Sequence, residues 1–263
     1  MSQKNTPRRY RRYVAIGDSS TEGLDDPDER GGYRGWANRL AEHLAAAEGE
    51  VLYANLAVRG LTSRQIRERQ LAKALAMSPD LVTFFSGTND VVGRRFAIEP
   101  VAEEIETVHR QVGECGAQLL TFTLPDLTPV MPAARRIAPR VAALNDAIRR
   151  IADRSGAIVV DFAAHPVASD PRLWSEDRLH ANSAGHARIA AALAAALGLP
   201  GADAEWAAPL PERPPLSAWQ KVGAEAAWGR KYLLPWLWRH LWGRSTGDGI
   251  VAKRPELAPL RPG

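Results

Sequence analysis

Short apolar runs alternate with longer amphipathic stretches along the chain up to Leu199. The runs have strand length, end at turn residues and comprise Tyr13–Ile16, Val51–Asn55, Leu81–Phe85, Gln118–Phe122 and Ala157–Asp161. Each run is nearly continuous in apolar residues, as is typical of strands that are buried on both faces. The pattern therefore predicts a central sheet of five strands.

Between these runs, apolar residues recur at three- and four-residue steps, which is the helical period. The predicted helices are Tyr33–Ala47, Ser63–Met77, Pro100–Val112, Pro139–Ala152 and Ser183–Leu197. Thr62 can cap the second helix, and Pro100 and Pro139 stand where a first helical turn tolerates proline. Strands that alternate with helices predict an α/β fold whose parallel sheet is covered by helices on both faces.

The same pattern divides the chain into three parts. Residues 1–12 form a basic arm, residues 13–199 form one α/β domain, and residues 200–263 form a linker and a tryptophan-rich extension. Residues 200–215 are rich in Pro, Ala and Gly, which is typical of a linker. Within the domain, the connection from Thr123 to Arg140 is long and proline-rich, so we expect either a functional loop or an irregular surface excursion.

The extension has a helical pattern of its own. Trp228, Tyr232 and Trp236 recur at four-residue steps, so residues 216–242 predict one or two helices that Pro235 should interrupt. Three interpretations remain: an arm that packs on the domain or in a dimer contact, a lid or wall of a pocket, and a peripheral contact with a membrane. The final residues, 245–263, lack an apolar period, and we expect them to run extended over the surface or to be mobile.

Composition excludes several classes of protein. Hydrophobic residues make up 45% and charged residues 24% of the chain, which are ordinary globular values. The single cysteine, Cys115, allows neither an intramolecular disulfide nor a cysteine-based metal site. No apolar run approaches the about 18 residues that span a bilayer. The basic start is not followed by the apolar h-region of a signal peptide, so we expect none. The missing apolar runs predict a cytoplasmic protein without stable membrane insertion. The basic residues form a short arm rather than a stripe, so we expect no nucleic-acid partner.

Polar and glycine residues follow four of the predicted strands. They lie in the segments 17–20, 55–60, 86–90 and, after a loop, 177–180. In a doubly wound parallel sheet the carboxyl ends of the strands form the edge where ligands bind. The sequence therefore predicts a site at this edge.

The candidate residues fit an acyl-transfer site. A serine hydroxyl such as that of Ser19 is a weak nucleophile until an imidazole removes its proton, and His180 can supply that imidazole. An acid must hold the histidine in the right tautomer. Asp177 has a suitable spacing, Glu176 is its rival, and Ser20 is a remote rival to Ser19.

Attack on a carbonyl also creates an oxyanion that needs fixed hydrogen-bond donors. The candidate donors are the backbone N–H of Ser19, the N–H of Gly60 and the side-chain amide of Asn89. A glycine at position 60 would let the backbone approach the substrate closely. We interpret Asp18 as a structural residue that bonds local backbone, and Asp90 as a structural residue that could cap a helix.

Ser19, Gly60, Asn89 and His180 match, in order, the four residues that name the SGNH hydrolases, also called GDSL esterases and lipases. The sequence resembles this family over roughly residues 13–198, with Ser20 where the family name has leucine, at a position that varies. The resemblance implies a three-layer α/β/α, flavodoxin-like fold with five parallel strands in the order 2-1-3-4-5. It also implies that no metal or organic cofactor is used, and it favours Asp177 over Glu176, because Asp177 falls on the Asp-x-x-His pattern.

These residues predict a serine esterase that hydrolyses carboxylic ester bonds of small molecules through an acyl-enzyme. Acetylated sugars, thioesters and lysophospholipids are alternative substrates for the same mechanism. The competing hypothesis is a non-catalytic binding module that presents the tryptophan-rich tail to a partner or membrane, and the complete catalytic set argues against it. The sequence is compatible with a homo-oligomer and does not define the oligomeric state.

Overall fold

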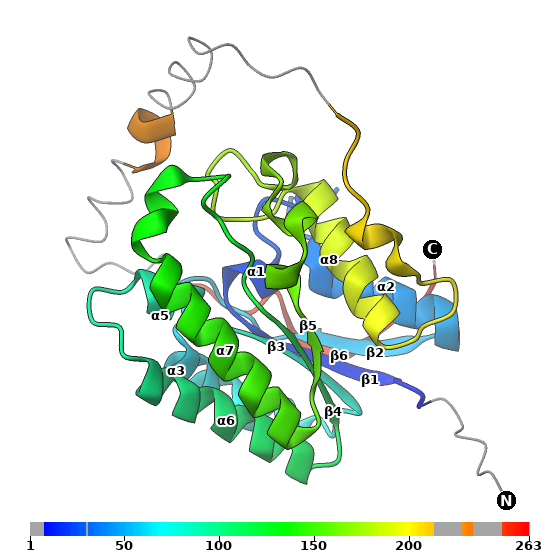
Figure 1. Cartoon of the computed structure of the whole chain (residues 1–263). Helices are drawn as coiled ribbons and strands as arrows, with labels where there is room; N and C mark the ends of the chain where they lie inside the picture. Colours follow the sequence, from blue (N-terminus) through cyan, green and yellow to red (C-terminus); the bar gives the residue numbers. More distant parts are fainter. Residues whose placement is uncertain (1–7, 30, 213–227, 234–248, 263) are drawn as a thin grey trace, which may run out of the picture.

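The computed structural model describes residues 8–29, 31–212, 228–233 and 249–262. A sheet with the strand order β5-β4-β3-β1-β2-β6 lies between two layers of helices (Figure 1). Its strands are β1 (Arg12–Gly17), β2 (Val51–Asn55), β3 (Leu81–Phe85), β4 (Gln118–Phe122), β5 (Ile158–Val160) and β6 (Arg254–Leu260). The first five strands are parallel and have the predicted order 2-1-3-4-5, which confirms the predicted α/β fold.

Helices cover both faces of the sheet. On one face α2 (Gly35–Glu48) packs against α8 (Ser183–Ala196), and on the other α6 (Ile98–Glu114) packs against α7 (Ala138–Ser155) (Figure 1). The shorter elements are α1 (Ser19–Glu22), α3 (Ser63–Ile66), η1 (Arg67–Leu71), α4 (Ala72–Ala76), α5 (Thr88–Val92), η2 (Pro132–Arg136), η3 (Phe162–Ala164), η4 (Pro166–Ser169), η5 (Pro171–Leu173), η6 (Ala204–Ala207) and η7 (Gly229–Leu233).

The strands form because their side chains are buried on both faces. All five residues of β3 are buried, as are the last five of β1. Aromatic rings join the sheet to the helices above its carboxyl edge: Phe122 stacks on Phe85 at 4.1 Å and meets Trp36 of α2 edge-on at 5.4 Å. This packing fixes the strand ends relative to α2.

The sixth strand corrects the prediction for the end of the chain. Residues 254–260 pair antiparallel with β2, with Val51 opposite Leu260, whereas the sequence predicts an end that runs extended over the surface or is mobile. Proline at positions 255 and 259 hid this strand in the sequence, because proline cannot donate to a ladder and suits only an edge strand. The β6 strand occupies such an edge.

Most of the tryptophan-rich extension lies outside the described residues. The helices predicted for 216–242 are described only at residues 228–233, and Trp219, Trp236, Trp238 and Trp242 fall in the remainder. Within the described ranges, no helix is long and apolar enough to cross a membrane.

The loop between α1 and α2 is closed at its two ends by glycines. Gly23 and Gly35 both have positive φ, at 97° and 68°, and their backbones touch, so that a Cβ at Gly23 would lie 2.6 Å from the Gly35 Cα. Inside the loop, buried Asp26 accepts from the Gly35 N–H at 3.0 Å and pairs with Arg39 of α2. The loop is therefore anchored to α2 at both backbone and side-chain level.

Alanine at Gly35 should destabilise the fold more than alanine at Gly31. Both glycines have positive φ (68° and 79°), which costs an L-residue about 1–2 kcal/mol, but only Gly35 lies against backbone, whereas a Cβ at Gly31 meets nothing within 4 Å. Overpacking should add ~1–3 kcal/mol for Gly35→Ala. Chemical unfolding of the two variants measures this difference, and equal losses would argue against the close contact of Gly23 and Gly35.

Candidate active site

The candidate nucleophile stands at the end of β1, on the first residue of α1. The side chain of Asp18 caps this helix by accepting the N–H of Ser20 at 3.1 Å. One residue earlier, the N–H and C=O of Gly17 both bond the buried side-chain amide of Gln70, each at 2.9 Å. Gln70 belongs to η1, a π-helical turn inside the helix that the sequence predicts from Ser63 to Met77, and such turns are frequent at functional sites.

His180 lies on a tight turn after η5. The Oδ1 atom of Asp177 accepts the N–H groups of Leu179 and His180 at 2.9 and 3.0 Å, and the Ser175 hydroxyl donates to it at 2.6 Å. The Ser175 N–H in turn donates to the His180 carbonyl at 2.8 Å. One carboxylate oxygen of Asp177 thus shapes the turn, and its second oxygen is left for the imidazole.

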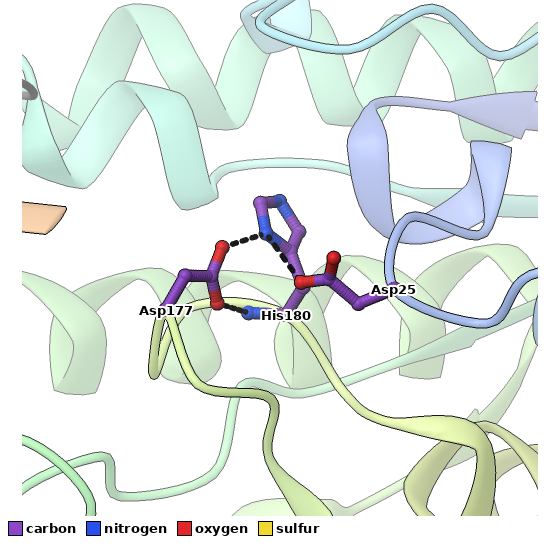
Figure 2. A group of neighbouring side chains, drawn as sticks. All are labelled: Asp25, Asp177 and His180. Carbon is purple, nitrogen blue, oxygen red and sulfur yellow. Dashed lines mark hydrogen bonds and ion pairs between the residues drawn. The ribbon is translucent and has the colours of Figure 1, made fainter. Parts of the chain in front are cut away.

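The structure brings Ser19, His180 and Asp177 together in a continuous chain of hydrogen bonds. The Ser19 Oγ lies 2.8 Å from His180 Nε2. On the other side of the ring, His180 Nδ1 lies 2.6 Å from Asp177 Oδ2 (Figure 2). A second carboxylate, that of Asp25, lies 3.8 Å from the same Nδ1 atom. This arrangement suits the transfer of the serine proton to the imidazole.

Burial and charge set the protonation states of this chain. Burial alone would raise the pKa of Asp177, but hydrogen bonds from His180 and Ser175 hold it well below its usual range. Burial would lower the pKa of His180, but the hydrogen bond and the charge of Asp177 outweigh it and raise this pKa. Asp177 therefore stays ionised and accepts the Nδ1–H, which leaves the Nε2 lone pair facing Ser19.

Asp25, Asp177 and His180 also form a group close enough to share a metal ion, with ligand atoms within 4.8 Å of one another. A metal on Nδ1 would displace the proton that Nδ1 donates to Asp177. In the neutral imidazole Nε2 would then carry the proton and could not accept that of Ser19. Metal binding here and a histidine base are therefore mutually exclusive.

Two of the predicted oxyanion donors are free to bind a ligand. Among the described residues, neither the Ser19 N–H nor the Gly60 N–H meets an acceptor. Gly60 has a φ of 79°, which suits glycine. Asn89 lies beside them, with its amide donating to Asp18 Oδ2 at 3.1 Å and to the Leu61 carbonyl at 3.0 Å. Its amide must release one of these acceptors to bind an oxyanion.

The rival residues are engaged elsewhere. The Ser20 hydroxyl accepts from the indole of Trp36 at 3.2 Å, and the exposed Glu176 pairs with Lys231 at 2.6 Å. Asp18 caps α1, and burial raises its pKa to about 6. Asp90 accepts the N–H and hydroxyl of Ser63 at 2.9 and 3.0 Å. Asp18 thus bonds local backbone, as its sequence context indicates, whereas Asp90 bonds the first residue of α3 and does not cap its own helix.

With this geometry established, comparison with known proteins assigns the family. The model of the GDSL-like lipase/acylhydrolase family matches residues 15–188, more than half of the chain. The protein belongs to this family. It is a carboxylic ester hydrolase of the serine type, as the sequence predicts. Among curated proteins, no match to the chain was found.

Solved structures of other hydrolases share the fold. LAE5, an alpha/beta hydrolase enzyme from the metagenome of Lake Arreo, is 25% identical with a TM-score of 0.60, over 72% of this chain and 95% of that one. The psychrotrophic esterase EstA from Pseudoalteromonas sp. is 17% identical with a TM-score of 0.58, over 71% and 96%. A variant of Axe2, an acetyl xylan esterase from Geobacillus stearothermophilus, is 18% identical with a TM-score of 0.60, over 72% and 95%.

A large cavity opens beside the candidate residues Ser19 and His180. Its volume is about 860 Å³, and Ser19, Gly60, Asn89 and His180 all lie on its wall. Most of the remaining wall is apolar and comes from segments far apart in the chain, including Phe85, Phe122, Leu124, Leu127, Met131, Ile137, Phe162, Ile189, Trp206 and Trp228. The long loop after β4 thus lines the site, which favours its functional interpretation.

The described part of the C-terminal extension contacts the turn that carries Asp177 and His180. The indole N–H of Trp228 donates to the Asp177 carbonyl at 3.3 Å, and the guanidinium of Arg178 lies 4.7 Å from the centre of the Trp228 ring. Trp228 also lines the cavity. For this residue the structure favours the pocket-wall interpretation. The sequence did not reveal this contact, nor those of Asp25 and Gln70, because none follows from a local pattern.

Replacement of Gln70 by leucine should weaken both the fold and the activity. The buried Gly17 N–H would lose its acceptor, at a cost of about 1–3 kcal/mol, and the turn that carries Ser19 would lose its support. Unfolding measurements and turnover of a nitrophenyl ester test this expectation. Gln118→Leu is the control, because that amide bonds backbone at the far end of β4. A Gln70→Leu enzyme with wild-type stability and turnover would contradict the role of Gln70 in supporting this turn.

Proposed function

We propose that Ser19 is the nucleophile, His180 its general base and Asp177 the acid that orients the histidine. The supporting observation is the unbroken chain of hydrogen bonds from Ser19 Oγ through the imidazole to Asp177. As Oγ attacks the ester carbonyl carbon, its proton moves to Nε2, and the imidazolium then returns it to the departing alkoxide. Water repeats these steps on the acyl-enzyme and releases the acid.

The backbone N–H groups of Ser19 and Gly60 bind the oxyanion in this mechanism. Their lack of an acceptor among the described residues supports the assignment, and Asn89 becomes the third donor when the oxyanion replaces its Leu61 acceptor. Loss of one such donor typically costs about 3–4 kcal/mol of transition-state stabilisation.

Alanine at Ser19 or at His180 should each lower kcat for nitrophenyl butyrate by at least about a thousandfold, because the nucleophile and its base act as a unit. Ser20→Ala is the matched control, since it removes the adjacent hydroxyl and should retain most of the turnover. Substantial turnover by Ser19→Ala or His180→Ala would remove that residue from its role. Loss of activity in Ser20→Ala alone would reassign the nucleophile.

We further propose that the acyl part of the substrate is an apolar chain longer than acetyl. The supporting observation is the size and the largely apolar wall of the cavity beside Ser19. Burial of each methylene contributes about 0.8 kcal/mol, so a chain that fills this space gains affinity that an acetyl group cannot. Acetylated sugars are therefore the less favoured of the ester substrates.

A series of nitrophenyl esters from acetate to decanoate tests this proposal. We expect kcat/KM to rise by up to about fourfold per added methylene until the cavity is filled. Trp228→Ala should flatten the rise, because it removes part of the wall, whereas acetate turnover should change less. A preference for acetate, or for acetylated xylo-oligosaccharides, would contradict the acyl-chain proposal and leave the catalytic roles untouched.

A further inference from the structure

Two carboxylates, on two different loops, face the same nitrogen of His180. Asp177 lies on the catalytic turn at 2.6 Å from Nδ1, and Asp25 approaches the same atom at 3.8 Å from the loop that follows α1 (Figure 2). Among the described residues, His180 is the one ion-pair partner of the Asp25 carboxylate. Asp25 is 41% exposed in its side chain, so it reaches the imidazole from the solvent side.

The backbone of Asp25 is held in place on both sides. The Leu24 carbonyl accepts from Nε2 of buried His186 at 2.9 Å. On the other side, buried Asp26 is bound to the Gly35 N–H and to Arg39. Asp25 itself has a φ of 64°, an uncommon conformation that aspartate tolerates better than most residues. The loop therefore presents this carboxylate to His180 at a fixed position.

Three acidic groups act on the charge of His180. Asp177 has the strongest effect, and the charges of Asp25 and Asp18 add to it, all raising the pKa of the imidazole against the effect of burial. Asp18 is buried and caps α1, so it lies outside the loop that carries Asp25.

The basic groups near His180 do little to oppose the rise in its pKa, because they are engaged with other side chains or are uncharged. The guanidinium of Arg178 lies over the Trp228 ring, and Lys231 pairs with Glu176. His186 of α8 is uncharged at neutral pH, because burial lowers its pKa to about 4. The second carboxylate therefore adds to a negative field around the imidazole.

We propose that Asp25 is a positioning residue, a second carboxylate whose charge stabilises the His180 imidazolium and which partners Nδ1–H when Asp177 is lost. This inference rests on the proposed function. The proton of Ser19 Oγ moves to Nε2 as the bond from Oγ to the carbonyl carbon forms, so the ring becomes positive. The Nδ1 proton stays on the ring, and Asp25 acts by charge without accepting it.

Asp25→Asn is the decisive variant, because asparagine tolerates the left-handed conformation and the exchange removes only the charge. Glu29→Gln is the matched control. Glu29 lies on the same loop, is exposed, and makes no ion pair with the described residues. We expect Asp25→Asn to lower kcat roughly 2- to 5-fold, as for a partly exposed pair, and to leave thermal stability close to that of the wild type.

The pH profile gives a readout that a structural role would not move. Activity requires neutral His180, so kcat/KM rises with pH through the pKa of His180. Removal of the Asp25 charge lowers that pKa, and the acidic limb should shift to lower pH in Asp25→Asn but not in Glu29→Gln. In an Asp177→Ala background, the fold-loss of kcat/KM caused by Asp25→Asn should be roughly 2 to 10 times larger than in the wild type, because the two carboxylates share one partner.

An unmoved acidic limb in Asp25→Asn, an equal shift in Glu29→Gln, or purely additive effects with Asp177→Ala would overturn the proposal. Ser19→Ala and His180→Ala, assayed in parallel, separate this failure from failure of the proposed function. If they are inactive while Asp25→Asn behaves as wild type, only the role of Asp25 is wrong. If they retain turnover, the triad itself is wrong.

Discussion

The hydrogen bond between Ser19 Oγ and His180 Nε2 joins two residues that are 161 positions apart, and the site depends on it. The parallel sheet makes this bond available because it gathers the carboxyl ends of its strands at one edge. Each partner is then fixed separately. Gln70 holds the backbone before the turn that carries Ser19, and Asp177 shapes the turn that carries His180.

The sequence was sufficient for the five parallel strands and for the residues of the candidate site. Ser19, Gly60, Asn89 and His180 each follow an apolar run, and the structure brings all four to one cavity. Local pattern and strand order carry this information, because position after a strand decides which edge a residue occupies.

The features that the sequence did not predict depend on contacts between segments far apart in the chain, which no local pattern indicates. The β6 strand contains prolines, and its pairing with β2 is a property of the folded sheet. Asp25 reaches His180 only because the loop between Gly23 and Gly35 is closed and anchored on α2. Trp228 contacts the turn that carries Asp177 and His180, from a segment beyond the linker. These features add contacts and pocket wall around a candidate site whose main residues the sheet brings together.

The central claim is that Ser19 is a nucleophile activated by His180. Intact-protein and peptide mass spectrometry after treatment with a fluorophosphonate tests it most directly, because the reagent traps an activated serine covalently. The account predicts one phosphonyl adduct, on Ser19, that is absent in Ser19→Ala and forms far more slowly in His180→Ala. No adduct on the wild-type enzyme, or the same adduct in Ser19→Ala, would contradict it.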